Sequence, residues 1–198
     1  MFGLFNNKKK EIVSNDFIWK NEIVKYNALI KHLQQMEKSV LIYYFEDTKA
    51  EAERYLTASQ MNFSTEANSF VTKVWLLNAD TLLHKSTIDN RTVFFAEHHP
   101  SYLREKEIKT HLFEKLGVHE VSFYTSFEDK LMQIFGSERI LQVMERMGFK
   151  DDEAIQHSLI SSSLEKAQQK VDAKISINSN TRLRKDWFEI NIPATEKL

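Results

Sequence analysis

The chain has 198 residues, among which there is no cysteine and there are only two prolines and four glycines. Without cysteine it has no disulfide framework, no thiol nucleophile and no thiolate ligand for a metal. This composition fits a reducing compartment, so we expect the cytoplasm. The scarcity of glycine and proline excludes flexible linkers and low-complexity tracts, and we therefore expect regular secondary structure along most of the chain.

A charge excess of one sign and long apolar runs are also missing. The 27 lysines and arginines nearly balance the 28 aspartates and glutamates, so no overall field attracts nucleic acid. No apolar run approaches the roughly 18 to 20 residues of a membrane-spanning helix. Residues 1–10 place an apolar patch before three lysines, the reverse of a secretory signal. We expect no membrane span and a flexible segment over 1–15, while peripheral membrane contact stays open.

The order of apolar patterns predicts the fold class. Continuous apolar runs at 39–45, 71–77, 92–96 and 120–125 predict strands that are buried on both faces. Helical spacing predicts helices over 16–38, over 49–59 after a capping box from Thr48 to Glu51, and over 102–116. This alternation predicts an α/β three-layer domain with a mostly parallel sheet. Beyond Gly136 the pattern is helical only, with helices around 140–147 and 164–175.

Two adjoining runs carry the most specific motif in the chain. They read Phe-Tyr-Thr-Ser-Phe-Glu-Asp-Lys-Leu-Met over 123–132 and Phe-Gly-Ser-Glu-Arg-Ile over 135–140. They resemble the end of the second motor domain of SecA, the ATPase of bacterial preprotein translocation. Val-Leu-Ile at 40–42 and the run over 164–171 resemble further parts of that family in the same order, so the resemblance covers about 17–184.

The resemblance implies a RecA-like α/β domain over 1–136, followed by a helical extension over 137–198. It also implies structural roles for a set of polar and glycine residues at the family's motif positions. These residues are Glu97, His99, Glu128, Asp129, Gly136, Glu138 and Arg139.

The residues that give the family its activity differ here. In SecA the helix after the Glu-Arg-His segment carries arginines that reach the phosphates of ATP, but residues 107–114 read Glu-Ile-Lys-Thr-His-Leu-Phe-Glu. Lys109 and His111 stand near the first arginine position, and a glutamate stands at the second. The four glycines are too scattered to form a phosphate loop. We therefore expect no ATP hydrolysis and no resident cofactor, with ATP or ADP near Lys109 and His111 only if a partner completes the site.

Two functions follow from this contrast. The first is a non-catalytic protein-interaction or regulatory module, linked to preprotein translocation and binding a translocation motor or a second copy of itself. The second is a nucleotide-binding half-motor that completes an ATPase site on a partner. Four apolar residues are candidates for interaction surfaces: Leu112 and Phe113, which replace small residues of the family, and Trp187 and Phe188, which either fold back or bind a partner.

Other chemistry is weakly supported. Glu97, His98 and His99 are adjacent, but neither His-x-x-x-His nor Glu-x-x-His occurs among the nearby histidines, so we expect no metal site. No strained Gly-x-Ser-x-Gly turn supports a serine hydrolase. The aromatic runs at 43–45 and 94–95 have no interleaved basic residues, so we expect them to pack in the core and not to stack on nucleic acid.

Overall fold

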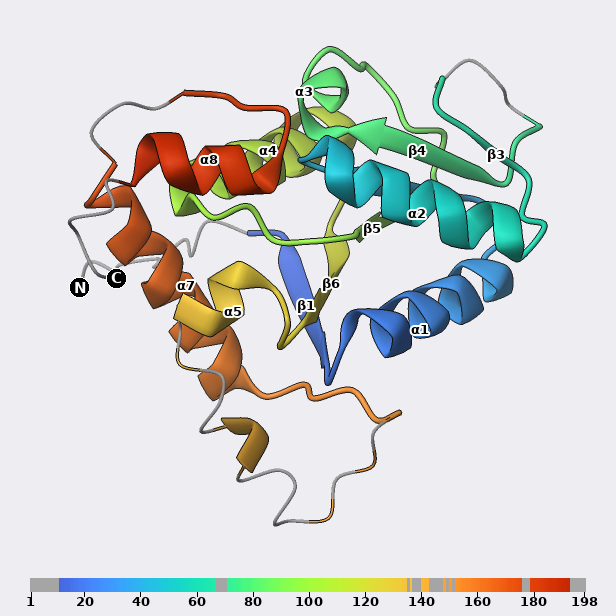
Figure 1. Ribbon diagram of the computed structural model, residues 1–198. Helices are drawn as coiled ribbons and strands as arrows, with labels where there is room; N and C mark the ends of the chain where they lie inside the picture. The colour runs from blue at the N-terminus through green and yellow to red at the C-terminus, as the bar shows by residue number, and fades with distance from the viewer. Residues whose placement is uncertain are drawn as a thin grey trace, which may run out of the picture.

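Six parallel strands form one sheet in the part of the chain that the structure describes (Figure 1). The computed structural model describes residues 11–66, 71–134, 136, 140–142, 148, 150, 152–175 and 179–192. The strand order is β1-β6-β5-β2-β4-β3. The strands are β1 Val13–Trp19, β2 Ser39–Tyr43, β3 Phe63–Ser64, β4 Val74–Asn78, β5 Thr92–Phe95 and β6 Glu120–Ser126. The predicted α/β class with a mostly parallel sheet is confirmed.

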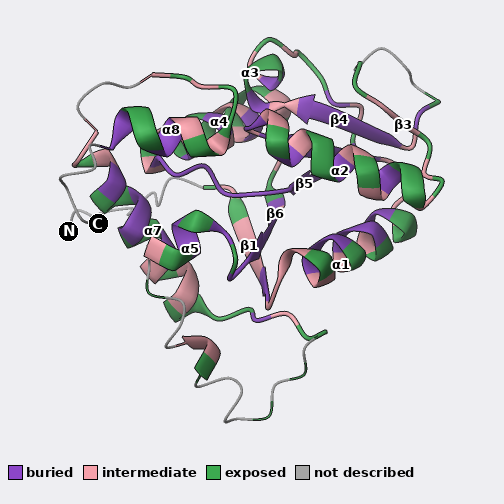
Figure 2. Cartoon of the chain, viewed as in Figure 1, coloured by how far each residue is buried: buried purple, intermediate pink, exposed green. Residues whose placement is uncertain are grey.

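Helices cover both faces of this sheet and the ends of its strands. They are α1 Glu22–Gln35, α2 Glu46–Ala58, α3 Ala79–Leu82, α4 Tyr102–Leu116, α5 Lys130–Ile134, α7 Ser158–Asp172 and α8 Arg184–Asn191. Side chains of α1 and α2 share one core cluster with the sheet, and side chains of α3 and α4 share another. Figure 2 shows the buried strands between these helical layers.

The central strands are apolar throughout because each successive side chain enters a different core. In β2, Leu41 and Tyr43 join the cluster under α1 and α2, whereas Val40 and Ile42 join the cluster under α3 and α4. All five residues of β2 are buried. Period-two alternation on a sheet covered on both faces thus produces the continuous apolar run seen in the sequence.

A third cluster lies where the strands end. Ile18 of β1, Phe45 after β2 and Phe127 after β6 pack with side chains from α5, α7 and α8. The chain that follows the sheet therefore covers its carboxyl edge instead of leaving it open. The predicted boundary at residue 136 stays a prediction, as does most of the helix expected around 140–147, since 143–147 lie outside the described residues.

The start of the domain differs from the prediction. Residues 13–19 form the edge strand β1, paired with β6 from Val13↔Glu120 to Trp19↔Ser126, where a helix after Asp16 and a flexible segment up to 15 were expected. The helix begins only at Glu22, because the Asn21 side chain accepts a hydrogen bond from the backbone N–H of Val24 at 2.9 Å. Trp19 is the last residue of β1, but its spacing from the apolar residues of α1 is helical. The predicted helix therefore included part of the strand.

The capping box at Thr48 is also wrong. Helix α2 begins at Glu46 with Phe45 as its N-cap, so Thr48 lies inside the first turn. Its hydroxyl donates to the Glu97 carboxylate at 2.7 Å, which is a long-range contact. The elements β3, α3, α5 and α8 were not predicted, because two to eight residues hold too few periodic positions.

Gly117 is the residue at which helix α4 ends. It has φ of 68°, the left-handed conformation that closes a helix, and no atom lies within 4 Å of an added Cβ. We expect Gly117→Ala to lower the free energy of unfolding by about 1 to 2 kcal/mol, because only backbone strain is introduced. Gly117→Asn should lower the free energy of unfolding by less than Gly117→Ala does, since asparagine tolerates the left-handed conformation better than alanine. Urea denaturation measures both, and equal stability of all three proteins would contradict this account.

Candidate functional site

Glu97 lies two residues beyond the end of β5 and is completely buried. Its Oε1 atom accepts the backbone N–H groups of Tyr44 at 2.8 Å and Phe45 at 3.0 Å. Its Oε2 atom accepts the Thr48 hydroxyl at 2.7 Å. The carboxylate therefore connects the end of β5 to the loop after β2 and to the first turn of α2.

Arg184, the first residue of α8, completes this group. Its Nη2 atom donates to Glu97 Oε2 at 2.6 Å and to the Thr48 hydroxyl at 2.5 Å, and Nη1 pairs with Asp129. Burial raises the pKa of Glu97 although Arg184 opposes the shift. Burial also acts to lower the pKa of Arg184, but Asp129 and Glu97 outweigh it and raise that pKa above its usual range. The result is a partly buried cation held by two buried carboxylates.

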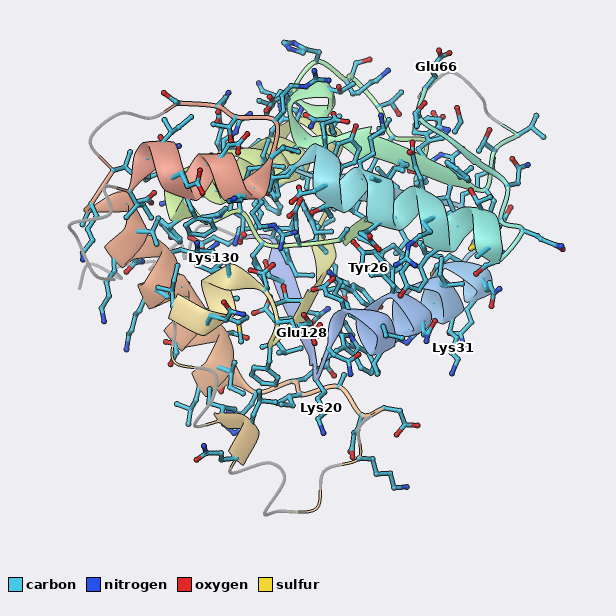
Figure 3. The ribbon with its side chains drawn as sticks, in the orientation of Figure 1. Lys20, Tyr26, Lys31, Glu66, Glu128 and Lys130 are labelled. Atoms are coloured by element: carbon cyan, nitrogen blue, oxygen red, sulfur yellow. The ribbon has the colours of Figure 1, made fainter. Side chains whose placement is uncertain are left out.

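A second polar chain runs beside this group. The ammonium of Lys25 is buried, donates to the Ala96 carbonyl at 3.2 Å and lies 2.6 Å from Glu22 Oε2. The Ser126 hydroxyl donates to Glu22 Oε1 at 2.6 Å. Glu128, labelled in Figure 3, accepts the Glu22 backbone N–H at 3.0 Å. The carboxyl edge of the sheet is thus occupied by protein side chains that form hydrogen bonds and ion pairs with one another.

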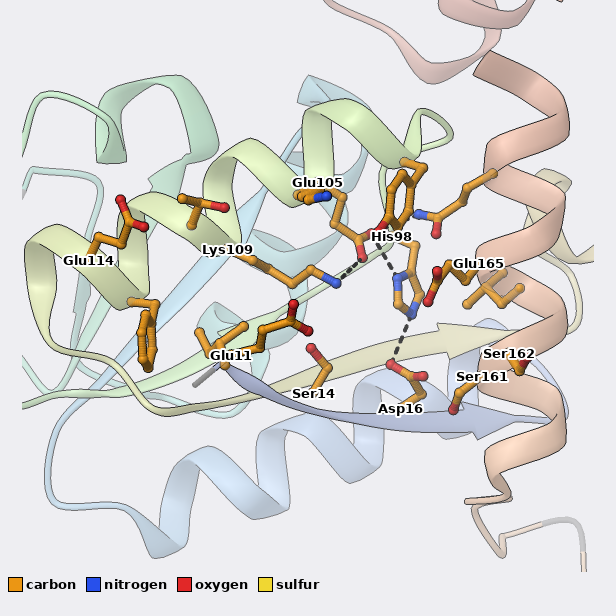
Figure 4. Close-up of a pocket in the computed structure, with 17 residues that line it drawn as sticks. Glu11, Ser14, Asp16, His98, Glu105, Lys109, Glu114, Ser161, Ser162 and Glu165 are labelled. Carbon is orange, nitrogen blue, oxygen red and sulfur yellow. Dashed lines mark hydrogen bonds and ion pairs between the residues drawn. The ribbon is translucent and has the colours of Figure 1, made fainter. Parts of the chain in front are cut away.

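A cavity of about 540 Å³ lies between β1, α4 and α7 (Figure 4). Lys109 faces it from α4, and its Nζ atom lies 3.3 Å from Glu105 Oε1. His111 does not line this cavity. The two residues expected near a nucleotide phosphate are therefore not brought together, because residues two apart on a helix point in different directions.

His98 is held between two carboxylates at one wall of this cavity. Its Nδ1 atom lies 2.9 Å from Glu105 Oε2, and its Nε2 atom lies 3.5 Å from Asp16 Oδ1. Gln168 of α7 donates to the same Glu105 oxygen at 2.9 Å. Burial acts to lower the pKa of His98, but Glu105 and Asp16 raise it to about 10. Burial acts to raise the pKa of Glu105, yet His98 lowers it to about 2. This buried ion pair joins α4, α7 and β1.

His99 behaves in the opposite way. Burial lowers its pKa to about 4, so the ring is neutral, and it stacks on Phe45 with centroids 5.6 Å apart. Trp187 meets the same ring edge-on at 5.3 Å. The adjacent histidines therefore have separate structural surroundings. Among the residues that the structure describes, no group of three histidine, cysteine or carboxylate side chains is arranged to hold a metal ion.

The apolar candidates have mixed outcomes. Leu112 is completely buried in the cluster under α4, so its expected place on an interaction surface is wrong. Phe113 is partly buried, lines the cavity and meets His119 edge-on. Trp187 and Phe188 fold back and are buried in the third cluster.

The remaining motif residues divide between described and undescribed parts of the chain. Glu138 and Arg139 lie outside the described residues, whereas Gly136 is described and has φ of 83°. Arg184, Lys25 and Glu22 were not predicted as site residues. Their only signal was the basic run at 182–185 and an Asn21-Glu22 helix start, neither of which identifies a buried partner.

No protein-family model matches the chain. Protein translocase subunit SecA of Phocaeicola vulgatus is 27% identical over 88% of this chain, which spans 18% of that relative. SecA of Christiangramia forsetii is 60% identical over 50 residues, 25% of this chain and 4% of that relative. A solved structure, the C-terminal part of the Fun30 ATPase domain, has a TM-score of 0.42 and 15% identity, covering 75% of this chain and 54% of that one.

The chain is thus SecA-like in sequence over most of its length, which confirms the resemblance. None of the helices in the described ranges is long and apolar enough to cross a membrane.

The His98 and Glu105 pair predicts how stability depends on pH. The pKa of Glu105 is lowered in the folded state, so its stabilisation is present above about pH 4.5 and is lost as pH falls toward 2. The pKa of His98 is raised, so its stabilisation is present below about pH 6.5 and is lost as pH rises toward 10. We expect the free energy of unfolding to fall by on the order of 1 kcal/mol or more between pH 6.5 and 10.

His98→Gln removes the titrating group. At pH 6.5 the free energy of unfolding of this variant in urea should be lower than that of the wild type, and it should change little between pH 6.5 and 10. His84→Gln, in the segment between α3 and β5, is the matched control and should keep the wild-type slope. A wild-type slope in His98→Gln would show that the pair does not titrate as described.

Proposed function

We propose that the chain is a non-catalytic SecA-like domain that binds other proteins and acts in preprotein translocation, in the cytoplasm and without a resident nucleotide. The observation that carries this proposal is the position of α8 on the carboxyl edge of the sheet. Arg184 is inserted among Glu97, Asp129 and Thr48, and Trp187 is buried beside His99.

The carboxyl edge matters because ligands of open parallel α/β sheets bind outside the carboxyl ends of the strands. A nucleotide at this edge would have to displace α8. It would then meet the buried carboxylate of Glu97 and the carboxylate of Asp129 without their cation. Triphosphate and carboxylates repel each other, which supports a role without nucleotide.

The alternative is a half-motor in which Lys109 supplies the missing positive charge to a nucleotide on a partner. Lys109 is engaged with Glu105, and that carboxylate is buried and also holds His98. Moving Lys109 to a phosphate would leave Glu105 with one cation fewer. This arrangement supports the protein-binding proposal over the half-motor.

The comparisons support a choice of partner. The relatives are named as translocase subunits, and this chain is similar to a segment of 18% of one of them. We propose that the partner is a SecA motor or a second copy of the chain, in line with a domain that keeps a motor's framework. The two can be separated by the mass of the complex.

Nucleotide titration tests the proposal. We expect calorimetry of the purified wild-type chain with ATP or ADP and magnesium to show no binding tighter than about millimolar. ATP turnover should equal that of a buffer blank, because Lys109 and Arg184 are paired with carboxylates of the protein and not free to stabilise a transferred phosphoryl group. Titration of a purified SecA motor with the chain should give a saturable complex.

Lys109→Ala is the diagnostic variant for the half-motor, with Lys106→Ala one turn away as its control. Under our proposal both variants match the wild type in ATPase assays with the SecA motor. Micromolar nucleotide binding, or turnover that Lys109→Ala abolishes and Lys106→Ala retains, would overturn the non-catalytic proposal in favour of the half-motor.

A further inference from the structure

Helix α8 is too short to be stable alone. It has eight residues, and isolated helices below roughly 12 residues are marginal in water. Its stability therefore comes from the surface beneath it. We call this surface the α8 groove and define it by Phe45, Thr48, Glu97, His99 and Asp129.

Helix α8 contacts the groove through one face. Arg184 in the first turn meets the carboxylates, and Trp187 and Phe188, three and four residues later, enter the apolar cluster. On the other face, the Lys185 side chain is 78% exposed and Ile190 is 52% exposed. Anchors at i, i+3 and i+4 are the pattern by which grooves recognise amphipathic helices.

An empty groove would lower the stability of the folded protein. Glu97 is completely buried, and removing the cation beside a buried carboxylate strongly destabilises the folded state. Two of its hydrogen bonds come from backbone N–H groups and one from Thr48, but Arg184 is the cation in contact with it. Release of α8 therefore favours entry of another cation at the same point.

We propose that the α8 groove is a docking site for a partner's amphipathic helix that carries an arginine in its first turn and an aromatic pair one turn later. Helix α8 is the internal occupant, and the partner helix replaces it. The acidic pair Glu97 and Asp129 selects the arginine, and the apolar floor around Phe45 selects the aromatic pair. The inference rests on the proposed protein-binding function and names the chemistry of the partner.

A labelled peptide tests the exchange. The probe is a fluorescein-labelled synthetic peptide of residues 179–192, and fluorescence anisotropy measures its binding to the full chain. Arg184→Ala in the chain weakens the internal helix and changes none of the residues that define the groove. We expect this variant to bind the peptide at least about tenfold more tightly than the wild-type chain, because internal competition is reduced.

Two matched controls accompany it. Lys185→Ala removes an exposed cation from the same helix, so this chain should bind the peptide as weakly as the wild type does. A peptide carrying Arg184→Ala should bind the Arg184→Ala chain about tenfold more weakly than the unaltered peptide, because a buried charge-assisted contact is lost. Hydrogen exchange should show faster exchange of the α8 amides in the Arg184→Ala chain than in the Lys185→Ala chain.

Several results would overturn the proposal. These are equal affinity of the two peptides, equal affinity of the three chains, or α8 amides that exchange no faster after Arg184→Ala. Arg184→Gln, which keeps hydrogen-bond donors without the charge, is the second variant if Arg184→Ala fails to fold by circular dichroism. A wild-type dimer that Arg184→Ala dissociates would assign the groove to a second copy and overturn the partner helix. Nucleotide and motor titrations use the wild-type chain, so their outcome separates failure of this inference from failure of the proposed function.

Discussion

The buried carboxylate of Glu97 is the interaction on which the rest of the structure depends. It is completely buried, so each of its bonds must come from the protein. Those bonds come from the backbone after β2, from Thr48 on α2 and from Arg184 on α8. One side chain thus sets where the central strand ends, how α2 begins and where the C-terminal helix docks. Loss of Arg184 would leave the Glu97 charge without a cation in the interior, and loss of another partner would leave one of its hydrogen bonds unmade.

His98, the residue after Glu97, connects a different set of elements. His98 points to the cavity between β1, α4 and α7 and pairs with Glu105, and Gln168 joins the same carboxylate. His99 then packs its neutral ring against Phe45 and Trp187. Three consecutive polar residues therefore hold the helices around one end of the sheet. The sequence predicted no metal site among them, and each of them contacts other groups of the protein.

The contacts of Glu97 and Arg184 bear on function because they lie at the carboxyl edge of the sheet. A parallel α/β sheet offers its carboxyl edge to ligands, and a motor domain needs that edge accessible. In this SecA-like chain the edge carries α8, a partly buried arginine and two buried aromatic side chains. Both proposals rest on this position of α8 at the carboxyl edge.

The local pattern of the chain was enough to predict the elements buried on both faces. Helix α4 was predicted with its observed bounds, Tyr102–Leu116, and β2, β5 and β6 to within two residues at each end, because continuous apolar runs and helical periodicity are local properties. The specific motif at 123–132 added the family resemblance, which the comparisons confirm.

The site depended on contacts between distant parts of the chain. Arg184 and Glu97 are 87 residues apart, and Lys25 and Ala96 are 71 residues apart. Edge strand β1 exists because β6, more than a hundred residues later, pairs with it. Side-chain direction separated Lys109 from His111 and buried Leu112. A local sequence pattern indicates which residues are buried and whether they form a helix or a strand. It does not indicate which distant side chain pairs with a buried charge, because only folding brings those side chains together.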